Sequence, residues 1–244
     1  TFYPSILVRR QLRVSSSNID ETINRFAQLS LAPHLGTNSL LSGSTSNLLS
    51  LNIFGGFVEE VKVMEFGGIV NIVRRNAGVI QAAGIGNFVG GNFRGFQASG
   101  ILNYTRRSFS GLQASGISNT VAGNLKGVQA TGIMNFAKGI NGAQLSGILN
   151  VSRNLSGLQA SSILNQAKTA HGAQVTAILN NADSLKGAQI SGAFNRARII
   201  RGTQITSLLN YANELNGVQI GVVNIANRGR ATQIGLININ RGGV

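Results

Sequence analysis

The stretch Gly142-Ala-Gln144-Leu-Ser-Gly147-Ile-Leu-Asn150 is one copy of a phrase that recurs along most of the chain. Its glutamine recurs at Gln81, Gln97, Gln113, Gln129, Gln144, Gln159, Gln174, Gln189, Gln204, Gln219 and Gln233. Its asparagine recurs at Asn87, Asn103, Asn119, Asn135, Asn150, Asn165, Asn180, Asn195, Asn210, Asn224 and Asn238. The period is 16 residues at first, then 15 and finally 14. Self-similarity of this kind is the signature of a repeat architecture.

Each change of period occurs once and then persists, as expected when a coil loses one residue at a corner. Parallel coils bring like residues into register, so stacked glutamines and asparagines form hydrogen-bonded amide ladders. The repeat therefore predicts an all-β fold, a β-solenoid of about twelve coils of 14–16 residues. We expect the array to span residues 51–244, with residues 1–50 as an N-terminal cap or attachment segment, because terminal repeats need atypical covers.

Each glutamine-to-asparagine segment alternates with the period of a strand, which places Gln113, Ser115, Ile117 and Asn119 on one face. We therefore expect one long strand from glutamine to asparagine and a short return. A glycine usually stands two residues before the glutamine and supplies the backbone freedom for a tight corner.

A transmembrane β-barrel is the alternative fold, since short strands with alternating polarity are also its signature. Phe88, Tyr104, Phe136 and Tyr211 follow their asparagines and would form an interfacial girdle. Against a barrel, the glutamine-to-asparagine spacing drops from six to five residues near the C-terminus. A barrel strand accommodates that change only with a bulge.

The N-terminal residues do not repeat. Residues 6–14 suggest a basic strand, and residues 19–29 suit a short helix because apolar side chains stand at 19, 23, 26 and 29. A strand over residues 26–31 is the alternative. The chain begins at Thr1 without a signal peptide, so we expect a mature or trimmed product.

The composition is strongly basic, with 21 Lys+Arg against 7 Asp+Glu and a net charge of +14 in 244 residues. Such a field favours polyanions such as lipopolysaccharide, anionic lipid or nucleic acid. The alternative role of the charge is solubility for an otherwise uncharged, glycine-rich surface. Nucleic acid is disfavoured, because the 3 Tyr and 11 Phe do not interleave with the basic residues as a stacking platform would.

The charges avoid every glutamine-to-asparagine segment and lie in the arcs between them. Stacked, they form a candidate polyanion edge: Arg106, Arg107, Lys126, Lys138, Arg153, Lys168, Lys186, Arg198 and Arg201. The sheet beside this edge is uncharged, and contiguous uncharged, partly apolar rows mark interaction surfaces. Ala114, Ala130 and Ala160 are the candidate docking face for a protein of the envelope or a membrane-associated assembly. The alternative is a solvated face that needs no partner.

No catalytic, cofactor or metal site can be nominated. The histidines are His34 and His171, and the acidic residues form no pair at a spacing that the repeat brings together. The absence of cysteine excludes a disulfide framework and thiolate metal ligands. No apolar run approaches the roughly 18 residues of a membrane-spanning helix. We therefore expect a protein that is not an enzyme.

The recurring Gly-x-Gln-x-Ser/Ala-Gly-Ile-x-Asn phrase resembles a surface-repeat family of Bacteroidota. The lead-in segments Leu31-Ala-Pro-His-Leu-Gly-Thr-Asn38 and Phe66-Gly-Gly-Ile-Val-Asn71 resemble it too, as does the shorter Gly217-Val-Gln-Ile-Gly-Val-Val-Asn224. The resemblance covers about residues 28–240 and implies a location in the bacterial envelope. It implies no catalytic residues.

Together these observations predict a structural or interaction module of the bacterial outer membrane or cell surface that docks a partner through its uncharged sheet. A barrel that conducts or transports solutes is one alternative function. A polyanion binder that uses the basic edge is another.

Overall fold

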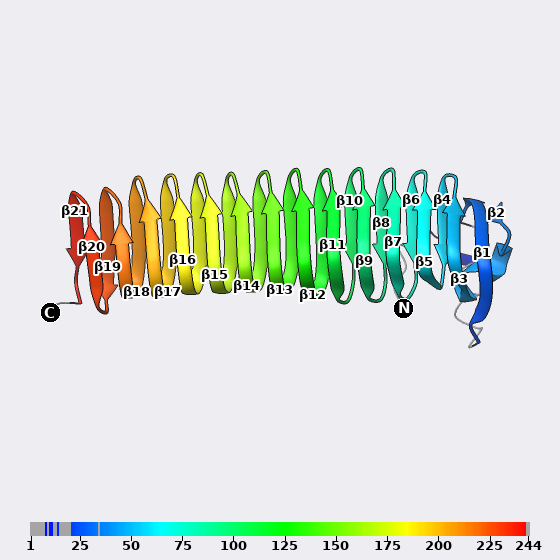
Figure 1. Cartoon of the computed structure of the whole chain (residues 1–244), viewed down its shortest axis with the longest axis horizontal. Coiled ribbons are helices and arrows are strands. Elements are labelled where there is room, and N and C mark those ends of the chain that lie inside the picture. Colours follow the sequence, from blue (N-terminus) through cyan, green and yellow to red (C-terminus); the bar gives the residue numbers. More distant parts are fainter. Residues whose placement is uncertain (1–7, 9, 12–13, 15–20, 34, 243–244) are drawn as a thin grey trace. The chain divides into compact units, whose positions relative to one another are not determined.

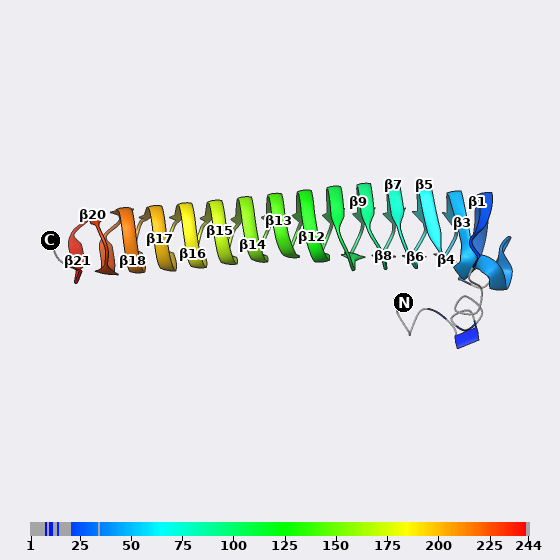
Figure 2. The ribbon, with the colours of Figure 1, turned by 90° about the horizontal axis from the view of Figure 1, so that it is seen from below.

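A computed structural model describes residues 8, 10–11, 14, 21–33 and 35–242. It is nearly all β, with 76% strand and 4% helix, and forms a β-solenoid of about 13 turns. The predicted all-β solenoid is confirmed. The chain divides into two compact units, Thr1–Gly127 and Val128–Val244, each described by itself below (Figures 1 and 2).

The first unit builds each coil from two short strands. Its elements are β1 (Ile23–Ala32), β2 (Leu35–Gly36), the short helix η1 (Ser39–Ser44), β3 (Thr45–Asn52), β4 (Gly55–Val58), β5 (Glu60–Gly67), β6 (Val70–Val73), β7 (Ala77–Ala83), β8 (Gly86–Val89), β9 (Phe93–Ser99), β10 (Leu102–Thr105) and β11 (Phe109–Ser115). β1, β3, β5, β7, β9 and β11 pair in parallel along one arm of the coils. β4, β6, β8 and β10 pair in parallel along the other.

In the second unit most coils are one continuous strand that bends at its middle. β12 (Ser118–Thr131) ends in this unit, and β13 (Met134–Ser146), β14 (Leu149–Ser161), β15 (Leu164–Thr176), β16 (Leu179–Ser191), β17 (Phe194–Thr206) and β18 (Leu209–Ile220) follow. The last coils divide again into β19 (Val223–Arg228), β20 (Ala231–Ile234) and β21 (Ile237–Asn240). Successive coils from β13 onward pair in parallel with like repeat positions opposite each other, as in Asn150 opposite Asn165.

The barrel alternative is wrong. A barrel of this kind needs antiparallel neighbours, whereas the coils pair in parallel and the described residues form a solenoid. The antiparallel pairing of β2 with β1 involves the first strand, not the repeats. The channel function that depended on a barrel therefore loses its structural basis.

The expectation of one long strand from glutamine to asparagine is also wrong. In the structure the chain turns between them: β14 ends at Ser161, just after Gln159, and β15 begins at Leu164, just before Asn165. The glutamine and asparagine still both point inward, but from the two opposite arms of a flattened coil. Ile117, expected on the face of Gln113, instead lies at the corner and is 42% exposed.

The opposite corner confirms the expected role of the glycine two residues before the glutamine. Gly157, Gly172 and Gly187 have φ values of +132°, +134° and +140°. These values lie where residues with a Cβ are strained. The glycines stand directly opposite one another in successive coils, so each bends its strand at the same place.

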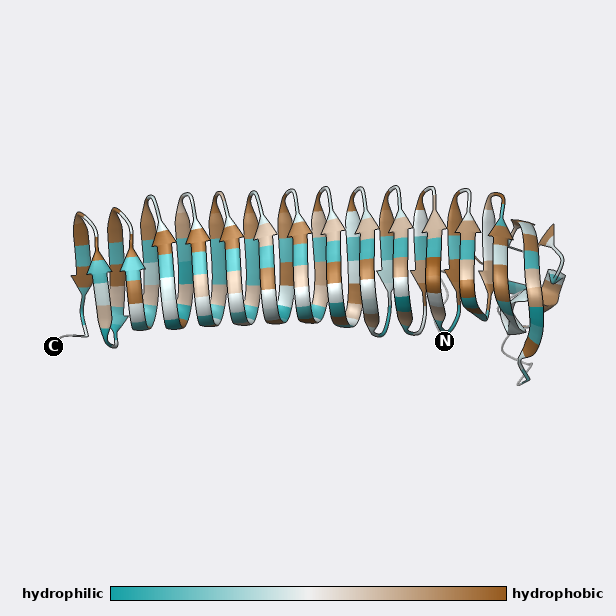
Figure 3. Cartoon of the chain, in the orientation of Figure 1, coloured by the Kyte–Doolittle hydropathy of each residue, from teal (hydrophilic) through white to brown (hydrophobic). Residues whose placement is uncertain are grey.

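The interior of each coil is half polar. The buried apolar side chains of the second unit form a narrow aliphatic column that includes Leu155, Leu185 and Ile200. The repeat glutamines and asparagines up to Asn224 are as deeply buried as these side chains. Figure 3 shows the result as hydrophilic bands that recur at the same level on successive strands of each unit.

The N-terminal residues correct two further expectations. Residues 23–32 are the strand β1, so the short helix over residues 19–29 is wrong where it is described, and the strand alternative is confirmed. Arg10, Gln11 and Val14 are helical, which contradicts a strand there; the rest of the predicted 6–14 strand, apart from Val8, lies outside the described residues. β1 already pairs in parallel with β3, and the predicted boundary at residues 50/51 falls within β3.

The corner glycines generate a testable expectation. Gly187→Ala should lower the free energy of unfolding by about 1–3 kcal/mol, because an alanine is strained at this φ and its Cβ would meet the carbonyl oxygen of Gly172. Gly192→Ala is the matched control in the same coil: its Cβ would also approach a backbone carbonyl, that of Ala177, but its φ is not in the strained region, and Ala177 and Ser207 carry a Cβ at this position in neighbouring coils. Urea unfolding followed by circular dichroism measures both, and equal losses would contradict the assignment of the strained corner to Gly187.

Candidate functional site

The glutamines of the second unit form a ladder of buried amides. Each Nε2 donates to the Oε1 of the glutamine one coil earlier, at 2.7–2.9 Å, from Gln144 onto Gln129 through to Gln233 onto Gln219. The same Nε2 lies near a carbonyl on the facing arm, as Gln189 does with Arg196 at 3.3 Å. The ladder therefore joins coil to coil and arm to arm.

The asparagines of the second unit form a second ladder that points the other way. Each Nδ2 donates to the Oδ1 of the asparagine one coil later, at 2.9–3.0 Å, from Asn135 onto Asn150 through to Asn224 onto Asn238. Asn150 also donates to the carbonyl oxygens of Gln144, at 3.2 Å, and Ala160, at 2.7 Å. Buried amides thus find partners in the adjacent coils.

The first unit carries the same two ladders and ends one of them with a carboxylate. Gln113 donates to Gln97 and Gln97 to Gln81, each at 2.7 Å. Gln81 then donates at 2.7 Å to Glu65, which occupies the glutamine position of its coil. The asparagine ladder runs from Asn52 to Asn119 with donors at 2.9–3.0 Å.

Glu65 is a fully buried acid with no cation among its hydrogen-bond partners. Burial raises its pKa to about 7, while hydrogen bonds from Gln81, Asn52 and Ser50 lower it in part. An ionised carboxylate only accepts hydrogen bonds, so it requires Gln81 to donate. The direction of the glutamine ladder in this unit follows from that requirement.

The candidate docking residues Ala114, Ala130 and Ala160 follow their glutamines and are half-buried. Ala160 stands opposite Leu145 and Val175 in neighbouring coils. We call this set the glutamine-flanking row. In the second unit it also includes exposed aliphatic side chains: Leu145, Val175, Ile190, Ile205, Ile220 and Ile234. In the second unit, Ala130 and Ala160 are therefore the small members of a larger apolar row, and the large members were not nominated from the sequence.

A second apolar row at the corner was missed by the sequence analysis. In the second unit this corner row contains Ile148, Ile163, Ile178, Leu208 and Val222, all exposed. The expected straight strand would have put these side chains on the face of the glutamines. The signal was the isoleucine of the phrase itself, which recurs without ever becoming charged. The glutamine-flanking and corner rows together are called the apolar edge below.

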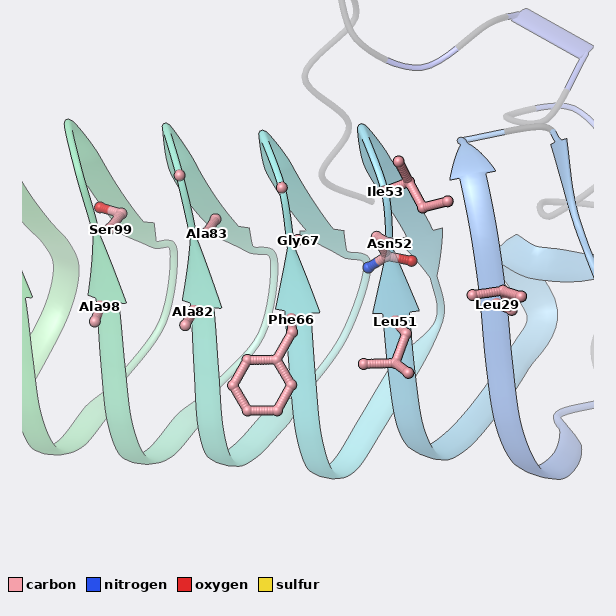
Figure 4. Close-up of a pocket in the computed structure, with 12 residues that line it drawn as sticks. Leu29, Leu51, Asn52, Ile53, Phe66, Gly67, Ala82, Ala83, Ala98 and Ser99 are labelled. Atoms are coloured by element: carbon pink, nitrogen blue, oxygen red, sulfur yellow. The ribbon is translucent and has the colours of Figure 1, made fainter.

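The first unit has a related apolar groove. Leu29, Leu51, Phe66, Ala82 and Ala98 stand in one register row on successive coils. The row steps from large side chains to small ones, and the groove lies where it does so (Figure 4).

The candidate polyanion residues lie in two places in the second unit and are exposed. Lys138, Arg153 and Lys168 occupy the same position of consecutive coils, three residues after the asparagine. The side chain that follows them is Asp183, which accepts a 2.8 Å hydrogen bond from Arg198. That hydrogen bond lowers the pKa of Asp183, so its carboxylate stays ionised. Lys186 and Arg201 stand opposite each other in a neighbouring row, next to His171.

The remaining candidates lie in the first unit. Arg106, Arg107 and Lys126 are exposed. Glu59 is buried, and its Oε1 lies 3.2 Å from the Nε of Arg75, which offsets part of the cost of burying the charge. His34 lies outside the described residues. No group of three or more His, Cys, Asp or Glu among the described residues could hold a metal ion.

Comparison with family models, with curated proteins and with solved structures returns no match for this chain. Over the part of the chain that the structure describes, no helix has the length and apolar character needed to cross a membrane.

Glu65 generates a prediction about pH. Its pKa is about 7 in the folded protein and 4.5 in the unfolded chain, so its contribution to stability is full below pH 4.5 and is lost as the pH rises to 7. Glu65→Gln continues the amide ladder without a charge. The variant should match the wild type below pH 4.5 and exceed it by about 3 kcal/mol above pH 7. Urea unfolding across this range measures the difference; an identical pH profile for the two proteins would contradict the assignment.

Proposed function

We propose that this protein is a non-catalytic interaction module that docks a protein partner through its apolar edge. The observation that carries the proposal is the set of exposed aliphatic side chains in the second unit, from Leu145 to Ile220 in one row and from Ile148 to Val222 in the other. Each row is apolar in every coil, with a half-buried alanine in one of them, Ala160 in the first row and Ala193 in the second. Single exposed aliphatic residues need no explanation, but contiguous rows of them mark interaction surfaces.

The form of this surface suits a protein partner. The coils repeat about every 4.8 Å, which sets the exposed side chains at a fixed spacing on a hydrogen-bonded scaffold. No charged residue interrupts the segments from Gln129 to Asn224 that present them. A rigid apolar strip requires little ordering when it binds, and this lowers the entropic cost of association.

The resemblance of the repeat supports a place in the bacterial envelope, at the outer membrane or the cell surface. Under this proposal the partner is another envelope protein. The ladders then serve to hold the apolar edge in position, with no cofactor and no chemical step.

A second candidate function is polyanion binding by the basic residues. It is favoured by Lys138, Arg153 and Lys168, which stack on consecutive coils without an acid between them. Like charges held about 4.8 Å apart repel one another, and a polyanion such as lipopolysaccharide would relieve that repulsion.

One experiment separates the two functions. The tagged protein is incubated with an isolated envelope fraction, cross-linked and recovered, and binding to purified lipopolysaccharide is measured in parallel. Ala160→Asp should abolish recovery of the cross-linked protein and leave lipopolysaccharide binding intact, because it places a charge in the apolar edge. Arg153→Glu is the matched control on the same strand. It should leave the recovery of the cross-linked protein unchanged and weaken the binding of lipopolysaccharide.

Recovery of the same cross-linked protein with Ala160→Asp as with the wild type would contradict docking through the apolar edge. Lipopolysaccharide binding that is independent of salt and of Arg153 would contradict the second function, because binding through exposed charges is screened by salt.

A further inference from the structure

The arm of the second unit that carries the asparagines has a pocket on its outer face. Leu179, Phe194 and Leu209 stand opposite one another on β16, β17 and β18, each one residue before its asparagine (Figure 1). Arg196 and Tyr211 stand opposite each other, each one residue after its asparagine. These two rows line a cavity of about 370 Å³. Small-molecule sites have volumes of about 300–1,000 Å³, so the cavity is large enough for a small ligand.

The coil of β17 departs from the repeat at this pocket. Among the residues that directly precede the repeat asparagines from Asn135 to Asn238, only Phe194 is aromatic. Among those that directly follow them, only Arg196 is charged. In the corner row, Ala193 stands where the other coils of the second unit carry isoleucine, leucine or valine. The coils do not need these departures to stack, and local breaks of a regular pattern are expected at functional sites.

Arg196 is the charged group that this pocket offers to a ligand. Its side chain is exposed and has no acidic partner among the described residues. Asp183, on the preceding coil, pairs instead with Arg198, with 2.8 Å between Oδ1 and Nε. Asn195 also lines the pocket, but its Nδ2 donates to Asn210 at 3.0 Å within the asparagine ladder. An anion that enters the pocket would therefore pair with the guanidinium of Arg196.

The walls of the pocket are apolar and held in position. The hydroxyl of Tyr211 accepts a 3.1 Å hydrogen bond from the Nδ2 of Asn227, which fixes the end of the ring. Leu179 and Leu209 are half-buried, and Phe194 between them is 42% exposed. Such side chains offer no partner to the hydroxyl groups of a sugar. They match the face of a flat apolar ring.

We propose that this pocket binds an aromatic carboxylate. The carboxylate pairs with Arg196, because the planar guanidinium matches it in a bidentate contact. The ring packs against Phe194 and Tyr211 and removes their apolar surface from water. An inorganic anion would leave the apolar walls wet, and a neutral aromatic molecule would leave Arg196 without a partner. The pocket lies outside the apolar edge, so this binding is independent of the proposed docking function.

Titration of the full chain with 2-naphthoate, followed by ligand-observed NMR, tests the proposal. Two further ligands separate the two contacts: 2-naphthamide has the same ring without the charge, and glucuronate has a carboxylate on a hydroxylated ring. The wild type should bind 2-naphthoate about tenfold more tightly than 2-naphthamide, because of the charge-assisted contact. It should also bind 2-naphthoate more tightly than glucuronate, because only the naphthyl ring buries apolar surface.

The variants use residues that the array already contains at these positions. Arg196→Gln introduces the residue found at Gln166, two coils earlier, and should remove the preference for 2-naphthoate over 2-naphthamide. Phe194→Leu introduces the residue of both neighbouring coils and should weaken both naphthyl ligands about two- to tenfold. Arg201→Asn is the matched control, because it removes one charge from the same strand outside the pocket, and Asn216 occupies its position in the next coil. It should leave both affinities unchanged.

Circular dichroism checks that each variant is folded. No binding of 2-naphthoate at millimolar concentration, equal affinity for 2-naphthamide, tighter binding of glucuronate, or an unchanged preference in Arg196→Gln would each overturn the proposal. An equal loss in Arg201→Asn would do the same, because it would show attraction by net charge alone. Ala160→Asp, which alters the apolar edge, should bind 2-naphthoate as the wild type does. A loss of binding in that variant would place the ligand on the apolar edge and contradict the inference.

Discussion

An amide side chain taken out of water must find a partner for its N–H and C=O groups, since an unpaired buried group costs about 1–3 kcal/mol. This protein buries two such side chains in nearly every coil, and most are wholly inaccessible to solvent. An apolar side chain can pack in many registers, but a glutamine Nε2 that bonds at 2.8 Å to the glutamine of the preceding coil fixes one. The rest of the structure depends on this requirement.

The opposite directions of the two ladders follow from the same constraint. Glutamines donate towards the N-terminus and asparagines towards the C-terminus, so the aligned amide dipoles of one column oppose those of the other. Two parallel columns would instead sum to a dipole across a low-dielectric interior. Any coil at the end of such a stack must present one free acceptor and one free donor. In the first unit the donor of Gln81 finds its acceptor in the carboxylate of Glu65.

Much of the fold was predictable from the sequence because the repeat constrains what lies next to what. The spacing of Gln144, Gln159 and Gln174 implies parallel coils in register, and the glycine before each glutamine implies a corner. The position of the second corner was not predictable from alternation, since six residues between glutamine and asparagine suit a straight strand as well as two arms that face each other. Because of that ambiguity, the sequence analysis did not predict that Ile148 and the other residues of the corner row are exposed.

The candidate surfaces were only partly predictable for a related reason. Charged side chains are seldom buried, so the sequence alone predicts that Arg153 and Lys168 are exposed. The pairing of Asp183 with Arg198 was not, because it joins residues one coil apart whose approach depends on the register. Glu65 was not assigned to the ladder because it is an acid, although Gly68, Ile69 and Asn71 of its coil match the phrase and place it at the glutamine position.

The central claim is that hydrogen-bonded amides, more than apolar burial, hold the coils in place. Equilibrium unfolding of Gln174→Leu tests it most directly. The substitution adds apolar character to the core but leaves the Oε1 of Gln159 without its donor and the Nε2 of Gln189 without its acceptor. We predict a loss of about 2–4 kcal/mol in the free energy of unfolding. Unchanged or increased stability would contradict the account and assign the stability of the coils to apolar burial.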